Sequence, residues 1–403
     1  LYISFKGDWG LSELPRKLDI MNASEFAAYR NDVIYFNNGK KQTTPQVSGQ
    51  LPFENPESYG EGTDWMDVLS RKAFTQGYTL ALSRGTTRSK EYFSIRFDDN
   101  DGIIKGSDFT RITSRLNLDW DLFKWLKAGL RGNFSTRNAN INNARINGGN
   151  NSAAVCLSPL LTIEDKWNKY ADTVVSGGSV FNNPYIVATN VTNMTKVRYL
   201  NLSPYLEFNI VKGLKFKSSY SYSLNTNETF YYAPSALPVA MDRKTGGTAR
   251  RTDHVKKNIL SENVLTYNRT FNRVHKMDLL AGFTAQNTNV DYKYTQGIGY
   301  LDDKVAFYNM GGLEDPRNLT EKSSVSEVQR LSFIARANYS YRSRYFATFT
   351  GRYDGASIFS EGNKWAFFPA VAFKWSISNE PFMAMAKANW LSDLAQDQCR
   401  TKR

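Results

Sequence analysis

A two-residue alternation of apolar and polar side chains runs through most of this chain. In residues 331–342 the odd positions are apolar or aromatic, and every even position except one isoleucine is polar. Residues 200–210 and 214–225 repeat the split with few exceptions. Because successive side chains of a strand point to opposite faces, this pattern predicts amphipathic β-strands. One face of the resulting sheet would be apolar and the other polar.

About twelve segments of the chain carry this strand pattern. Many approach the roughly 9 to 11 residues that a tilted strand needs to cross a bilayer. The segments are residues 1–10, 78–84, 91–98, 109–120, 126–136, 200–210, 214–225, 259–267, 277–286, 331–342, 345–353 and 367–377.

The links between these segments alternate between short and long. The short links are residues 86–89, 121–124, 212–213, 270–274 and 342–344, and the long ones are residues 99–107, 138–196, 226–257, 287–327 and 354–365. Outer-membrane barrels have short periplasmic turns and long extracellular loops, whereas a soluble β-sandwich has no reason to put its long loops at one end. We therefore expect an all-β fold, an antiparallel transmembrane β-barrel fragment of about twelve long strands.

Composition is consistent with such a barrel. The 403 residues are 41% hydrophobic and 14% aromatic, which excludes general disorder. The mean hydropathy of −0.49 and the lack of a long apolar run exclude a membrane-spanning helix. They do not exclude membrane strands, because an apolar face and a polar face average out as polar.

Residues 11–74 are the least strand-like stretch. Asn22 followed by Glu25 predicts a capping box at the start of a short helix. Asp64 is placed to cap a second helical turn that runs to Leu69. We expect this stretch to be a long-loop excursion with short helices.

The net charge of +13 with 23 Tyr and 25 Phe raises the question of nucleic-acid binding. The basic residues fall largely on the polar faces of predicted strands, which in a barrel line a wet lumen. We therefore favour a polar lumen and no nucleic-acid partner. The residues concerned are Arg111, Arg115, Lys127, Arg131, Lys215, Lys217, Arg336 and Arg352.

The chain offers little catalytic or metal-binding chemistry. Its two histidines, His254 and His275, are expected in a loop and at a turn, and Cys156 and Cys399 fit no zinc or disulfide spacing. Residues 98–102 contain three aspartates, but their offsets do not match a calcium loop and favour a solvated loop tip. We expect no catalytic residue, no metal and no cofactor, and hence no enzyme.

Several strings occur in a familiar order. They are TDW at 63–65, YTLALSRG at 78–85, GIIKGSD at 102–108, RYDG at 352–355, EGNKW at 361–365, FP at 368–369 and WSISNE at 375–380. In this order and spacing the chain resembles the SusC/RagA family of TonB-linked outer-membrane transporters. The motif residues that carry the resemblance best are Arg352, Tyr353, Asp354, Gly355, Gly362, Asn363, Trp365, Phe368, Pro369 and Trp375.

The resemblance implies a larger protein. Members of the family have an energy-coupling segment, a plug domain and a barrel of about 22 strands. By this comparison residues 1–394 are a partial barrel without plug or final strands, with residues 11–74 as the excursion. Residues 395–403 lose the alternation and are expected to be a non-family tail. We expect such a fragment to be unable to transport alone.

Function, partners and location also follow from the resemblance. It implies import of an oligosaccharide or oligopeptide through the outer membrane of a Gram-negative, Bacteroidetes-like cell. The implied partners are membrane lipid, a SusD-like surface lipoprotein and the TonB complex, which would be reached through a plug segment. A small passive outer-membrane pore and a soluble all-β binding module remain as alternatives.

Substrate contacts are expected among aromatic side chains of the long loops. Aromatic faces with neighbouring polar groups suit sugar rings and hydroxyls. Packing within the loops is the competing role for each of these side chains. The candidates are Trp167, Tyr170, Tyr185, Tyr231, Tyr232, Tyr300 and Tyr308.

Overall fold

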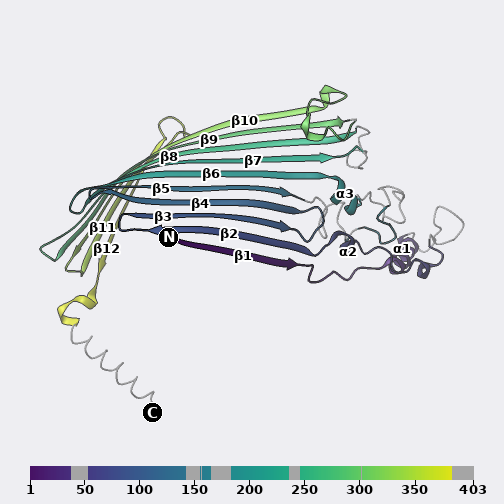
Figure 1. Ribbon diagram of the computed structural model, residues 1–403, viewed down its shortest axis with the longest axis horizontal. Coiled ribbons are helices and arrows are strands. Elements are labelled where there is room, and N and C mark those ends of the chain that lie inside the picture. The colour runs from purple at the N-terminus through teal and green to yellow at the C-terminus, as the bar shows by residue number, and fades with distance from the viewer. Residues whose placement is uncertain are drawn as a thin grey trace, which may run out of the picture.

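The computed structural model describes residues 1–37, 53–141, 155, 157–164, 183–235, 246–300 and 302–383. Their dominant feature is one twelve-stranded antiparallel sheet in which the strands follow one another in chain order (Figure 1). Every paired strand lies next to its neighbour in sequence, so the sheet is a meander without crossovers. The predicted all-β fold of twelve antiparallel strands is confirmed.

The strands are long. Those near the middle of the chain are the longest, and β9 has 26 residues. Their bounds are β1 (Tyr2–Ser12), β2 (Ala73–Gly85), β3 (Ser89–Asp101), β4 (Asp108–Phe123), β5 (Leu126–Asn140), β6 (Thr192–Val211), β7 (Leu214–Ala233), β8 (Gly247–Phe271), β9 (His275–Tyr300), β10 (Leu319–Tyr341), β11 (Tyr345–Ala356) and β12 (Trp365–Trp375).

Several strands run further toward the long loops than the alternation predicts. The expected loops at residues 226–257 and 287–327 are in large part strand, because β7 to β10 continue through them as paired ladders. His254 accordingly lies within β8 and not in a loop. The extensions of β8 and β10 carry mostly polar residues on both faces, so they lack the apolar signal that marks the rest of each strand.

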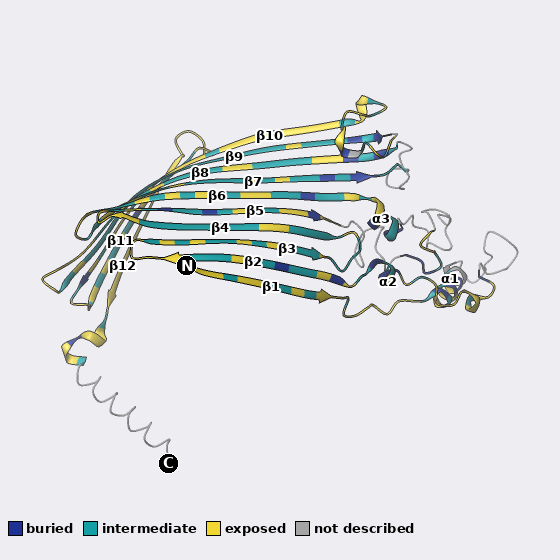
Figure 2. Cartoon of the chain, viewed as in Figure 1, coloured by how far each residue is buried: buried dark blue, intermediate teal, exposed yellow. Residues whose placement is uncertain are grey.

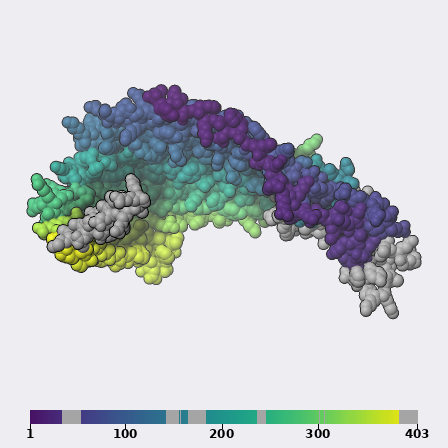
Figure 3. Space-filling model, turned by 90° about the horizontal axis from the view of Figure 1, so that it is seen from below, coloured from purple at the N-terminus to yellow at the C-terminus, as the bar shows by residue number. Residues whose placement is uncertain are grey.

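Register separates an apolar face from a polar face across the whole sheet. Phe333 on β10 stands opposite Phe283 on β9 and Tyr353 on β11, while the intervening Ser332 and Ile334 point to the other side. The large exposed hydrophobic side chains gather on the apolar face, and yellow exposed segments mark many strands in Figure 2. The sheet is curved, and in Figure 3 its N-terminal and C-terminal strands stand on opposite sides of a hollow.

Short turns join the strands at one end, which we call the short-turn end. Asn272 and Arg273 between β8 and β9 have φ values of 50° and 61°, and Arg342 and Ser343 between β10 and β11 have 49° and 53°. Positive φ at both central residues defines type I′ turns, whose twist matches that of the flanking strands. The opposite end carries the long links and is called the long-loop end.

The helices lie at the long-loop end. They are α1 (Ala23–Asn37), α2 (Trp65–Leu69) and α3 (Pro184–Asn190), with the short 3₁₀ turn η1 (Pro56–Tyr59) between α1 and α2. The remaining 3₁₀ turns are η3 (Ala306–Tyr308), η4 (Pro316–Asn318), η5 (Ile377–Asn379) and η6 (Pro381–Met383). Within the described residues, no helix has the length and apolar character needed to cross a membrane.

Both predicted helix caps are confirmed. The Asn22 side chain accepts a hydrogen bond from the Glu25 backbone at 2.9 Å, and the Glu25 carboxylate accepts one from the Asn22 backbone at 3.0 Å. Asp64 accepts bonds from the backbone N–H groups of Met66 and Asp67, each at 3.0 Å. These contacts satisfy donors that every helix start leaves open.

A small hydrophobic core holds α2 and α3 on the sheet. Trp65 and Leu69 of α2 pack with Val187 of α3 and with Ala233 at the end of β7. The Trp65 indole N–H donates to the Ser158 carbonyl at 3.0 Å, so the buried ring has no unsatisfied donor. Residues 395–403 and both cysteines lie outside the described residues.

Candidate functional site

The polar face of the sheet carries an ion-paired network on β1 to β4. Arg96 Nη1 and Nη2 donate to the two Asp8 carboxylate oxygens at 3.1 and 3.0 Å, and Arg96 Nε donates to Asp98 at 2.7 Å. Arg111 donates to the other Asp98 oxygen through Nε and Nη2, both at 3.0 Å. We call Asp8, Arg96, Asp98 and Arg111 the charged ladder. Its alternating signs run across three strands and neutralise one another.

Asp98 is the centre of the charged ladder and is only 4% exposed. The sequence-based interpretation of residues 98–102 as a solvated loop tip is wrong for this residue, since β3 continues to Asp101. Two guanidinium groups hold the carboxylate, which makes its burial tolerable. No group of His, Cys, Asp or Glu side chains in the described residues is arranged to hold a metal ion.

A second polar cluster lies near the short-turn end. Arg131 on β5 binds both Asp119 oxygens at 2.7 and 2.9 Å, and the Tyr205 hydroxyl on β6 donates to the same carboxylate. The Lys217 ammonium on β7 stands 4.5 Å from the centre of the Tyr205 ring. Gly129 on β5 leaves room for this ring, because a Cβ there would overlap it. A polar hollow of about 340 Å³ opens beside these residues.

Register places all the basic residues expected on a lumen on the polar face, including Arg115 and Arg336. Several have acidic partners there: Lys127 lies 3.2 Å from Asp121, Lys215 lies 3.5 Å from Glu207 and Arg352 lies 2.7 Å from Asp354. The cations were predicted from the sequence, whereas these carboxylates and those of the charged ladder were not. Asp98 stands directly opposite Arg111 in register, a relationship that the alternation along each strand does not give.

The motif residues of β11 and β12 pack against one another. The Tyr353 and Trp365 rings stack with centroids 4.8 Å apart and planes 15° apart. Gly355 stands opposite Trp365, and a Cβ at this glycine would lie 2.7 Å from the indole ring. Arg352 and Asp354 form an ion pair on the other face. In the structure, this motif makes contacts within the sheet.

The remaining motif residues occupy the link and the far end of β12. Gly362 has a φ of 86°, a left-handed value that favours glycine, in the link that also contains Asn363. Phe368 and Pro369 are paired with β11 inside β12. Trp375 donates to Glu380 at 3.0 Å, and Arg344 lies 3.3 Å from the same carboxylate.

Two of the substrate-contact candidates are packed inside the protein. Tyr232 is 4% exposed and Tyr300 is fully buried, with ring centroids 6.2 Å apart. The Tyr232 hydroxyl donates to Asp303 at 2.7 Å, and the Tyr300 hydroxyl donates to the Met310 carbonyl at 2.9 Å. Both side chains therefore hold the link between β9 and β10 against the sheet.

The other described candidates differ in exposure. Tyr308 of η3 is 82% exposed. Tyr185 of α3 and Tyr231 of β7 are partly buried against the small core, with Lys105 over the first ring and Arg250 over the second. Trp167 and Tyr170 lie outside the described residues. The structure thus brings Tyr232 and Tyr300 into contact as buried side chains, whereas the Tyr308 side chain is exposed to solvent.

The Asp64 carboxyl, in the excursion between β1 and β2, has a lowered pKa. Burial alone would raise the pKa of its carboxyl, but hydrogen bonds from Lys17 and from the backbone N–H groups of Asp67 and Met66 outweigh that and lower the pKa. The Lys17 ammonium is 2.8 Å from Asp64 and 2.8 Å from Asp67. These two hydrogen bonds raise the pKa of Lys17.

An antiparallel meander with one apolar and one ion-paired polar face defines part of an outer-membrane β-barrel. In solved structures the fold is that of TonB-dependent receptor barrels. The sheet superposes on a chain of the RagAB peptide transporter with a TM-score of 0.75, at 19% identity and over 94% of this chain and 45% of that chain. Within that class the chain is similar to part of a SusC/RagA-type receptor.

Curated relatives agree with this assignment. The chain is 29% identical over 381 residues to TonB-dependent receptor P3 of Formosa agariphila, covering 93% of this chain and 36% of the relative. It is 23% identical over 416 residues to TonB-dependent receptor SusC of Bacteroides thetaiotaomicron, covering 97% of this chain and 38% of the relative. No protein-family model matches the chain.

The chain thus spans little more than a third of the length of these curated relatives. The relatives are named as receptors and not as enzymes, in agreement with the expectation of no catalytic function. These relatives are TonB-dependent receptors of Bacteroidetes, which supports the expected location of this chain in the outer membrane of such a cell.

Proposed function

We propose that this chain forms part of the wall of an energised outer-membrane importer for an oligosaccharide or an oligopeptide. The observation that carries the proposal is the continuous sheet with an apolar face suited to lipid and an ion-paired face suited to a wet lumen. In this proposal residues 1–394 are a partial barrel and residues 11–74 are its outer excursion. Residues 395–403 form a tail with no part in transport.

The proposed partners follow from the two ends of the sheet. A SusD-like surface lipoprotein would cover the long-loop end, where α1 to α3 lie. The TonB complex would act through a plug segment, which the described residues do not include. The RagAB chain on which the sheet superposes belongs to a peptide transporter, which supports an oligopeptide as one of the two substrate classes.

Tyr308 is the described candidate best placed to meet a substrate. Its ring is 82% exposed at the long-loop end, whereas Tyr232 and Tyr300 are committed to packing. An exposed aromatic face offers apolar contact to a sugar ring or to a peptide side chain. Replacing Tyr308 by alanine should raise the KM for uptake about fivefold. Tyr29 of α1, which is 48% exposed, supplies the matched control in a Tyr29→Ala variant.

Uptake by cells tests the proposal. A strain that carries the gene and one in which it is deleted are given labelled oligosaccharides and labelled oligopeptides separately. We expect the deletion to abolish uptake of one class, and loss of the inner-membrane proton gradient to abolish the same uptake in the parent strain. Uptake that survives loss of the gradient would instead indicate a passive pore. Recovery of the chain without detergent in the soluble fraction would indicate a soluble binding module.

A further inference from the structure

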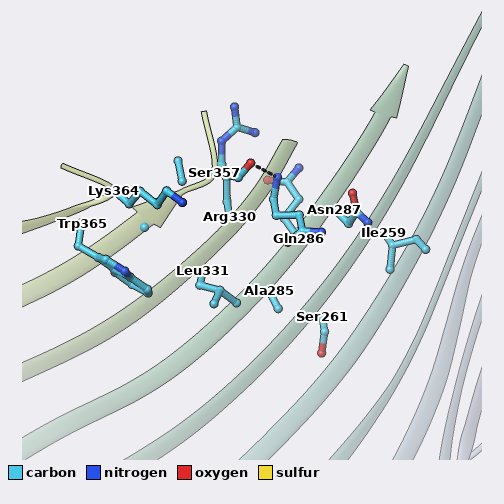
Figure 4. Close-up of a pocket in the computed structure, with 13 residues that line it drawn as sticks. Ile259, Ser261, Ala285, Gln286, Asn287, Arg330, Leu331, Ser357, Lys364 and Trp365 are labelled. Carbon is cyan, nitrogen blue, oxygen red and sulfur yellow. Dashed lines mark hydrogen bonds between the residues drawn. The ribbon is translucent and has the colours of Figure 1, made fainter. Parts of the chain in front are cut away.

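A groove of about 480 Å³ crosses the apolar face of β8 to β12 (Figure 4). Register aligns its floor in one row across five strands, formed by Ser261, Ala285, Leu331, Gly355 and Trp365. Three of these side chains are small, so the row lies lower than the surface around it. In Figure 4 the Trp365 ring closes one end of the row.

A ridge of aromatic side chains borders the groove on the side of the short turns. Phe283, Phe333 and Tyr353 follow one another in register. The Phe283 and Phe333 rings are 5.1 Å apart at their centroids, and Tyr353 stacks on Trp365 at 4.8 Å. The groove therefore has an apolar floor and an aromatic wall.

The small-then-large pattern repeats one step further along the strands. Ala281, Ala335 and Gly351 share the next row and form the floor of a second hollow of about 560 Å³. Five neighbouring strands spaced about 4.8 Å apart make the row from Ser261 to Trp365 roughly 19 Å long. A long, narrow and apolar depression of this kind fits a hydrocarbon chain better than a compact polar solute.

The groove lies where the apolar face of the sheet ends. On β10 that face runs from Tyr341 to Leu331, which spans about 25 Å of membrane for a strand with a typical tilt. The next residues on the same face, Gln329 and Glu327, are polar. The groove therefore opens at the boundary between hydrocarbon and headgroups on the long-loop side.

Lys364 stands at this boundary and forms no ion pair with an acidic side chain of the described residues. It lines the groove from the link before β12, and its ammonium group points inward over the groove in Figure 4. The Glu327 carboxylate on β10 is already bound by Asn287 at 2.9 Å and by Gln329 at 3.0 Å. Lys364 is thus placed to bind an anion located just beyond the apolar floor.

We propose that this groove binds a membrane lipid, with one acyl chain along the row from Ser261 to Trp365 and its headgroup phosphate on Lys364. The apolar floor matches the acyl chain and the ammonium group matches the phosphate. The floor lies on the hydrocarbon side and Lys364 on the headgroup side, as the two parts of a lipid do in a bilayer. The inference uses the orientation of the sheet in the membrane and does not rest on import.

Native mass spectrometry of the full chain in detergent tests the lipid site. The probes are dioleoylphosphatidylglycerol and dioleoylglycerol, which have the same acyl chains with and without a phosphate. We expect wild-type protein to retain phosphatidylglycerol about tenfold more tightly than the Lys364→Gln variant, because a charge-assisted contact is lost. Lys124→Gln at a short turn is the matched charge control and should bind like wild type.

A second variant separates the acyl contact from the charge. Ala285→Leu fills the floor of the groove and should weaken binding of both probes, whereas Ala128→Leu on the apolar face of β5 should weaken neither. Excess inorganic phosphate should not displace the lipid. Equal retention of both probes by wild type, Lys364→Gln and Ala285→Leu, with unchanged heat-modifiable gel mobility, would overturn the proposal. Displacement by free phosphate would overturn it as well.

Discussion

Arg96 on β3 binds Asp8 on β1 with both of its terminal nitrogens, directly above the backbone of Gly77 on β2. The two N–O distances are 3.1 and 3.0 Å. The pair therefore bridges a strand that contributes no side chain at this point. A Cβ at position 77 would lie 2.7 Å from the Asp8 carboxylate, so only glycine leaves the space. A glycine in a strand interior here marks a close approach of two side chains.

Gly77→Ala should break the Asp8–Arg96 pair and lower the denaturant concentration at the midpoint of unfolding. The added methyl group collides with both partners, and neither can move away without losing a bidentate contact. Unfolding of detergent-solubilised protein by guanidinium, followed by circular dichroism, measures the effect.

Gly85 on the same strand is the control for Gly77. A Cβ at Gly85 meets no atom within 4 Å, so Gly85→Ala should stay within about 0.5 kcal/mol of wild type. If both variants unfold at the same midpoint, the space above Gly77 has no role in stability.

The excursion between β1 and β2 should loosen in acid. Asp64 has a lowered pKa in the folded chain, so its contribution to stability is present above the pKa of an unfolded aspartate and is lost as the pH falls through the lowered value. The NMR signal of the Trp65 indole N–H, which donates to Ser158, reports on this region. We expect that signal to broaden or shift between about pH 5 and about pH 2.

Asp64→Asn is the informative variant for the acid transition. Asparagine keeps a cap for α2 but cannot titrate, and it loses the ion pair with Lys17. The Trp65 signal should then be nearly independent of pH in the acid range. A transition identical to that of wild type would assign the acid sensitivity to other carboxylates.

The architecture of the sheet was predictable because it depends on a local signal. Alternation in segments such as residues 331–342 indicates a strand and its lipid-facing side at once, and the helix caps at Asn22 and Asp64 are equally local. The strand extensions around His254 lack that signal, because both of their faces are polar. Partners such as Asp98 and Arg111 depend on the register between strands, which alternation alone does not give.

The residues available for substrate contact were less predictable, because their exposure also depends on contacts between distant segments. An exposed tyrosine such as Tyr308 and a buried one such as Tyr300 look alike in a loop sequence. Their difference arises from the cluster of Phe230, Tyr232 and Phe307, which forms only when distant segments fold together. Burial of this kind is a property of tertiary packing and not of local pattern.

Arg273→Gly should stabilise the hairpin between β8 and β9. Arg273 has a φ of 61° at the second central position of a type I′ turn, where glycine after asparagine is preferred. Relief of the left-handed strain should raise the free energy of unfolding by about 0.5 to 1 kcal/mol. Arg317→Gly, at a residue with an ordinary backbone in η4, should not stabilise, since it removes the pair with Asp315. A lower midpoint for Arg273→Gly in guanidinium unfolding would contradict the turn assignment.

Ser218 and Ser221 on β7 should differ in their access to water. Ser218 bonds Asn263 on the apolar face, and Ser221 bonds Ser203 on the polar face. Each is replaced by cysteine in a background that carries Cys156→Ser and Cys399→Ser, and the protein is reconstituted in phosphatidylcholine vesicles. A membrane-impermeant maleimide should label Ser221→Cys readily and Ser218→Cys slowly, while a lipid-soluble maleimide should react with Ser218→Cys. The opposite order would mean that the apolar face is turned away from lipid, and equal labelling of both by the impermeant reagent would show that the sheet is not embedded in the bilayer.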